Sequence, residues 1–192
     1  MGVLIMNINQ NHAAKDYLRE YHSLLDDASY AISRIDKGCT ARGHFLLTMI
    51  YCQRLSEGMC DSLLRYSASG PTRDLALRMH REHSALALDM KRALGRTSGG
   101  RRSAEWEEEY KTRAERIFVR MLEDMRCADV RERINCDFIR EMIPLREGCI
   151  RASQNLLSFD APRETAGLAA DIISLAKRDI SDLQRLHCMI DC

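Results

Sequence analysis

The feature that most constrains the fold is an internal repeat, because the second half of the 192-residue chain matches the first without a gap. A shift of 93 positions pairs apolar residues that recur at three- and four-residue spacing: Phe45 with Phe138, Met49 with Met142, Ile50 with Ile143, Leu63 with Leu156, and Leu75 with Leu168. This spacing places side chains on one face of an α-helix. The repeat therefore predicts two copies of one helical unit.

A Gly- and Ser-rich segment at 95–102 separates the copies, which predicts a linker between a first repeat over 12–94 and a second over 103–190. Each repeat holds three apolar stripes, so we predict helices near 12–35, 43–67, 71–94, 103–127, 135–158 and 163–188. No stretch alternates with a period of two, which predicts an all-α fold. We expect the hairpins 43–94 and 135–188 to pack as one compact four-helix bundle with pseudo-two-fold symmetry. Pro144 lies inside the fifth helix and predicts a kink there.

Charge and hydropathy exclude several classes of protein. The 29 basic and 28 acidic residues are interleaved along the chain, whereas a nucleic-acid binder usually carries a basic excess on one face. No apolar run reaches the roughly 20 residues that span a bilayer. The first residues lack the basic region and the long apolar run of a signal peptide. We therefore expect a soluble cytoplasmic protein that binds neither nucleic acid nor membrane.

Two segments of the second half carry a resemblance to a known family. Residues 138–150 read FIREMIPLREGCI, and residues 168–183 read LAADIISLAKRDISDL. They resemble the bacterial domain-of-unknown-function family 305, whose hallmark F-x-x-x-M-I-P-H-H-x-G-A-I is followed by a helix L-A-x-x-I-I-x-x-Q-x-x-E-I-x-x-M. The resemblance extends to the first half, where it is weaker. It implies a ferritin-like helical bundle, and in some Met- and His-rich members it implies copper binding.

The chain departs from the hallmark at the paired histidines. Cys52 and Gln53 stand at these positions in the first half, and Leu145 and Arg146 stand there in the second. Leu and Arg are not ordinary metal ligands, so the second half is expected to bind no metal. The resemblance thus implies two degenerate tandem copies that have lost the paired histidines.

A soft-metal site in the first half is one interpretation of the remaining residues. Met49, Cys52 and Met59 are predicted to share a helix face, and His83 lies on the apolar stripe of the next helix. Thioether, thiolate and imidazole groups together suit copper(I), so these four residues are the candidate ligands. The alternative interpretation is that they fill the core, which is the commoner role of Met and buried Cys.

Catalytic motifs are not evident in the sequence. The chain has no Glu-x-x-His motif for a di-iron centre, and its eight cysteines include no C-x-x-C pair. Cys39 follows Gly38 in a predicted loop and is expected to be the most exposed and reactive thiol. Cys188 and Cys192 are expected to be thiols at a frayed end, spaced so that they could bond to each other. We predict no catalytic residue and no enzymatic activity.

Two function classes remain after these exclusions. The first is a metal-free helical scaffold or protein-interaction module that binds a protein partner or a second copy of itself. The second is a cytoplasmic protein that handles a soft metal, copper(I), or thiols. We favour the first, because the ligand pairs of the resembled family are missing while the apolar stripes of the core are retained.

Overall fold

The structure is a computed structural model that describes residues 2–36, 38–67, 70–96, 103–159, 161–190 and 192, with side chains from His12 onwards. Over this part of the chain it has six helices and no strand, which confirms the predicted all-α class. The helices are α1 (Gly2–Ser33), α2 (Ala41–Tyr66), α3 (Pro71–Leu94), α4 (Ala104–Arg126), α5 (Ile134–Leu157) and α6 (Arg163–Met189).

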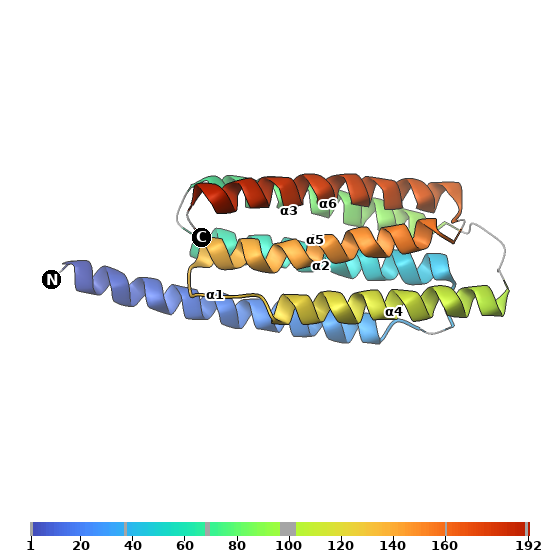
Figure 1. Ribbon diagram of the computed structural model, residues 1–192, viewed down its shortest axis with the longest axis horizontal. Helices are drawn as coiled ribbons and strands as arrows, with labels where there is room; N and C mark the ends of the chain where they lie inside the picture. The colour runs from blue at the N-terminus through green and yellow to red at the C-terminus, as the bar shows by residue number, and fades with distance from the viewer. Residues whose placement is uncertain (1, 37, 68–69, 97–102, 160, 191) are drawn as a thin grey trace.

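Helices α2 to α6 begin and end within two residues of their predicted positions, and so does the end of α1. The start of α1 differs from the prediction. The prediction of a start at 12 is wrong, since α1 begins at Gly2 and runs past the ends of the other helices (Figure 1). No Pro or further Gly interrupts the chain between Gly2 and Ser33, so nothing in the sequence stops the helix there. Most of the predicted linker, at 97–102, lies outside the described residues.

Local sequence signals explain several of the helix ends. Thr40 caps α2 by accepting a hydrogen bond from the Gly43 amide at 3.2 Å. Pro71 occupies the first turn of α3, where its missing N–H removes no hydrogen bond of the helix. The residue before it, Gly70, has a φ of 109°, a backbone conformation that favours glycine. Helix α5 continues through Pro144, and the kink there stays a prediction.

The six helices form three layers of two (Figure 1). Helices α2 and α5 contact each other in the middle layer. On one side α3 packs on α2, α6 packs on α5, and α3 and α6 also contact each other. On the other side α1 packs on α2, while α4 packs on α5 and to a lesser extent on α2. The central helices are therefore covered on both sides, which explains why they carry most of the buried polar residues.

The apolar stripes meet in one core that runs through all three layers. Its largest side chains include Tyr17 and Tyr21 of α1, Phe45 of α2 and Phe138 of α5. Helices α4 and α5 approach closely at Gly148, where an added Cβ would lie 2.3 Å from the Cγ of Met121. The absence of a side chain at Gly148 thus sets the spacing of these two helices.

Candidate functional site

A cluster of polar side chains lies at the centre of the four helices α2, α3, α5 and α6. We call it the central polar cluster, and its members are Gln53, Ser56, His83, Arg146 and Asp179. Each side chain is at most 1% exposed. Burying polar groups is costly unless they are hydrogen-bonded, and charged residues are almost never fully buried without a partner. The cluster is therefore the strongest departure from an ordinary core in the described residues.

Arg146 is the hub of the central polar cluster. Its Nη1 lies 3.4 Å from the Oε1 of Gln53, and its Nη2 donates to the hydroxyl of Ser56. The same Nη1 lies 3.2 Å and 3.3 Å from the two ring nitrogens of His83. A guanidinium stays charged in proteins, so Arg146 places a permanent cation at the centre of the bundle.

His83 links the two sides of the cluster through its ring nitrogens. Its Nδ1 lies 2.7 Å from the Oε1 of Gln53, and its Nε2 lies 3.2 Å from the Oδ2 of Asp179. Burial, and then the neighbouring Arg146 cation, lower the pKa of His83 to about 4. The imidazole is therefore neutral near pH 7, and its single N–H serves one of these two acceptors at a time.

Asp179 connects the buried cluster to charges at the protein surface. The Nη1 of Arg78 lies 3.7 Å from its Oδ1, and the Nη2 of Arg78 also donates to Asp182. The Nη1 of Arg78 donates to Glu82 at 3.1 Å. Arg78 and Glu82 belong to α3 and the two aspartates to α6, so this network joins the outer helices over the bundle centre.

Two buried thiols adjoin the central polar cluster. Cys52 of α2 and Cys149 of α5 interact through a hydrogen bond, which raises the pKa of Cys52. The same bond is the main cause that lowers the pKa of Cys149 to about 7, and the Arg146 cation adds to this effect. Of the two thiols, Cys149 is the one whose surroundings favour the thiolate, and both side chains are buried away from solvent.

The structure buries all four candidate copper(I) ligands, and the polar contacts of Cys52 and His83 are with other residues. His83 contacts Gln53, the neighbour of Cys52, while Cys52 interacts with Cys149. Met49 and Met59 are both fully buried on α2 within the apolar core. Among the described residues, no three His, Cys, Asp or Glu side chains are grouped so that they could hold a metal ion.

The predicted roles of two other cysteines are wrong. Cys39 was expected to be exposed and reactive, but it is partly buried, and burial raises its pKa. Cys192 was expected to be a thiol, or to bond Cys188, but it forms a disulfide with Cys136, with the two Cα atoms 5.5 Å apart. The antiparallel packing of α5 and α6 brings the end of the chain to the start of α5, which spacing along the sequence does not show.

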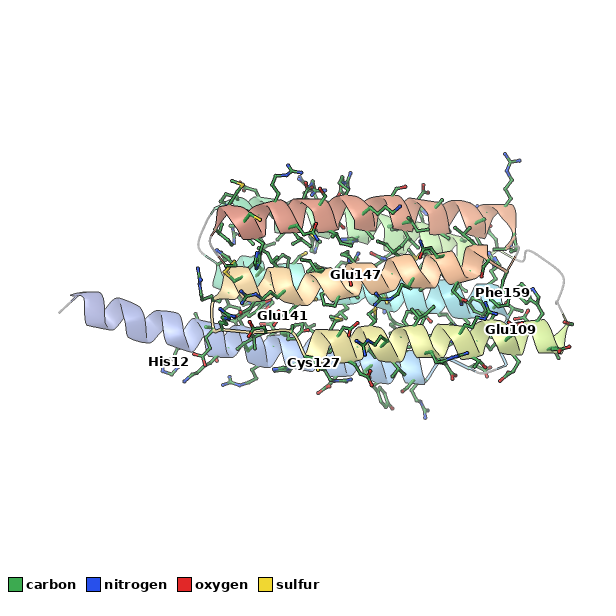
Figure 2. All side chains as sticks on the ribbon, in the orientation of Figure 1. His12, Glu109, Cys127, Glu141, Glu147 and Phe159 are labelled. Carbon is green, nitrogen blue, oxygen red and sulfur yellow. A yellow bond between two sulfur atoms is a disulfide. The ribbon has the colours of Figure 1, made fainter. Side chains whose placement is uncertain are left out.

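A second buried polar pair joins α1 to α5, on the other side of the middle layer. The hydroxyl of Tyr17 donates to the Oε2 of Glu141 at 2.6 Å. Burial raises the pKa of Glu141 to about 8. Within the described part of the chain, its Oε1 has no hydrogen-bond partner. Figure 2 places Glu141 beneath α5, toward the α1 and α4 layer.

Sequence reasoning missed three functional candidates that the structure reveals. Arg146 was noted only as a lost ligand, whereas Cys149 and Asp179 were not singled out. One signal was present, because Arg146 interrupts the apolar stripe of Met142, Leu145 and Cys149 with a charge. A charge on a stripe that must be buried indicates an internal partner.

The fold and the site together define a class: an all-α protein of six helices with a buried polar cluster centred on arginine. No family model matches the sequence, and no curated protein or solved structure matches it. Among the described helices, none is both long enough and apolar enough to cross a membrane.

Proposed function

We propose that this protein is a non-enzymatic helical scaffold or protein-interaction module whose bundle centre holds an arginine in place of a metal. The observation that carries the proposal is the buried guanidinium of Arg146. It contacts Gln53, Ser56 and His83 at the position where the resembled family 305 has one of its paired histidines. A built-in cation at this point repels a second cation in a medium of low dielectric constant.

The proposal includes descent from two tandem copies of a ferritin-like unit with pseudo-two-fold symmetry. Three contacts support this. Helices α2 and α3 pair within the first repeat, α5 and α6 pair within the second, and α2 meets α5 between them. Gln53 and Arg146, which occupy equivalent positions of the two repeats, face each other across this last contact.

The interaction-module part of the proposal rests on apolar side chains that face outwards. Leu77 and Leu88 lie roughly three turns apart on α3, and both are exposed. Single exposed leucines are ordinary, but two on one helix face give a partner a surface to cover. Light scattering coupled to size exclusion tests the self-association form, with the double variant Leu77→Glu, Leu88→Glu as the comparison.

A second candidate function, thiol or copper(I) handling, is favoured by one specific observation. Cys52 and Cys149 interact across the contact of α2 with α5, and Cys149 is activated toward its thiolate. Two thiols so placed could ligate copper(I), or form a disulfide by giving two electrons and two protons to an oxidant. Copper(I) binding through Cys52 with Met49, Met59 or His83 belongs to this alternative.

The cytoplasmic location is part of the proposal, and the Cys136–Cys192 disulfide supplies its test. Disulfides persist in oxidising compartments and are rare where glutathione keeps thiols reduced. Alkylation of thiols in freshly lysed cells reports the state of this pair. A reduced pair supports the cytoplasmic location, and an oxidised pair contradicts it.

Copper(I) titration distinguishes the two candidate functions. Protein purified without oxygen is analysed for metal and then titrated with copper(I) against a chromogenic chelator. The variants are Cys52→Ser and, as a matched control, Cys60→Ser, another buried thiol of α2. A metal-free scaffold is expected to hold copper(I) no more tightly than free thiols. One tightly bound copper(I), lost in Cys52→Ser but kept in Cys60→Ser, would overturn that proposal in favour of the alternative.

A further inference from the structure

A cavity of about 350 Å³ lies between α1 and α4, on the opposite side of the middle layer from α3 and α6. Helices α3 and α6 pack against each other, whereas α1 and α4 are held mainly through the central helices beneath them. The space between α1 and α4 is therefore incompletely filled. Its volume falls within the range of sites for small molecules.

The walls of this cavity are mostly apolar. Ile32 near the end of α1 and Ile35 just beyond it form one wall. Phe118, Val119 and Leu122 of α4 form the other. Val119 is 56% exposed, which is high for a valine beside a core phenylalanine. Apolar walls that stay open to water favour an apolar guest, because binding removes their surface from water.

His44 of α2 also lines the cavity and is only 8% exposed. Its ring meets the edge of Tyr110, with the ring centroids 6.0 Å apart. Among the described residues, its Nδ1 has no hydrogen-bond partner. Burial, and then the Lys111 ammonium, lower the pKa of His44, so the ring is neutral near pH 7 and can offer one N–H. A buried ring nitrogen without a partner beside a cavity is what a polar ligand group would satisfy.

The charges around His44 indicate the sign of that polar group. Lys111 and Glu115 lie one turn apart on α4, and both line the cavity. The ammonium of Lys111 acts on His44 more strongly than the carboxylate of Glu115 does. A head group that meets His44 therefore lies beside the Lys111 ammonium, which favours an anionic group there.

We propose that this cavity binds a monocarboxylate with an apolar body. The apolar body of the ligand lies between Ile32 on the α1 side of the cavity and Val119 on the α4 side. Its carboxylate accepts hydrogen bonds from Lys111 and His44. The proposal is independent of whether a metal binds at the bundle centre, because the cavity lies on the other side of α2.

Calorimetric titration with decanoate, and with decanol as a neutral analogue, tests the proposal on the wild-type protein. We expect saturable binding of decanoate that is about tenfold or more tighter than that of decanol, the gain of a charge-assisted hydrogen bond. Lys111→Gln is expected to remove that difference. Val119→Glu is expected to weaken both ligands, because it places a charge in the apolar wall.

Leu157→Glu at the end of α5 is the matched control, since Leu157 is another exposed apolar residue that does not line the cavity. It should leave both affinities unchanged. The proposal is overturned if decanoate shows no saturable binding, if decanol binds as tightly as decanoate, or if Leu157→Glu weakens binding as much as Val119→Glu. The first two outcomes need no variant, so they do not depend on whether a variant folds.

Discussion

The side chains of Gln53 and Arg146 meet across the contact of α2 with α5, with the Nη1 of Arg146 3.4 Å from the Oε1 of Gln53. The two residues stand 93 positions apart in the chain, which is the shift that pairs the two halves in the proposed repeat. Two identical copies would place two identical residues at this point. The observed amide and guanidinium instead form a complementary pair.

Removal of the Arg146 cation is expected to destabilise the protein strongly. Arg146→Met leaves Gln53, Ser56 and His83 buried with fewer partners, and breaking a buried charge network costs about 3–5 kcal/mol. The free energy of unfolding is measured by urea denaturation. Arg151→Met is the control, since Arg151 is partly exposed on the same helix and its surface ion pairs contribute about 1 kcal/mol or less. Equal losses in the two variants would contradict a special role for Arg146.

Oxidation is expected to join Cys52 to Cys149. Hydrogen peroxide converts the Cys149 thiolate to a sulfenic acid with release of hydroxide, and the Cys52 thiol then displaces water from the sulfenic acid to form the disulfide. Peptide mapping without reducing agent detects this link, beside the existing link of Cys136 to Cys192. Cys149→Ser should abolish the new link, and Cys60→Ser should not. Oxidation confined to the exposed thiols Cys127 and Cys188 would refute the prediction.

Glu141 is expected to make stability fall as the pH rises. Burial raises its pKa from 4.5 to about 8, so the folded state keeps a proton that the unfolded state releases above pH 4.5. The stabilising effect of that proton is complete below pH 4.5 and is lost as the pH rises toward 8. Within this window the free energy of unfolding should fall by up to about 1.4 kcal/mol per pH unit relative to a variant without the carboxyl group.

Glu141→Gln supplies that variant, because its amide oxygen can still accept the hydrogen bond from Tyr17. Urea denaturation between pH 4.5 and 8 is expected to show a flatter pH profile for Glu141→Gln than for the wild type. Glu147→Gln is the control, since Glu147 lies on the same helix with a side chain 49% exposed (Figure 2). Parallel profiles for the wild type and Glu141→Gln would show that Glu141 is ionised in the folded protein at neutral pH.

Two glycine substitutions are expected to have opposite effects. Gly148→Ala would place a Cβ 2.3 Å from the Cγ of Met121, so α4 and α5 must shift, at a cost of about 1–3 kcal/mol. Gly167→Ala on α6 meets no atom within 4 Å and should stabilise the helix by up to about 1 kcal/mol. Thermal unfolding of both variants measures the difference. A neutral Gly148→Ala would mean that Met121 moves aside without cost.

The sequence determined the helices more closely than it determined their contacts. Apolar stripes with helical spacing and the Gly70–Pro71 break predicted five helices to within two residues. The cap at Thr40, which starts α2 two residues earlier than predicted, was seen only in the structure. These signals are local, because hydrogen bonds within a helix join residues four apart. The start of α1 was missed because residues 2–11 carry neither a stop signal nor a helical stripe that extends the one at Tyr17 and Tyr21.

Only the tertiary structure decided which buried faces meet. A stripe shows that a face is covered but not what covers it, so the sequence named His83 and Cys52 without showing that they contact Gln53 and Cys149. The pairing of Cys136 with Cys192 depends in the same way on how α5 and α6 turn back on each other. The activation of Cys149 and the neutral state of His83 follow from burial and from the Arg146 charge, which exist only after the four helices assemble.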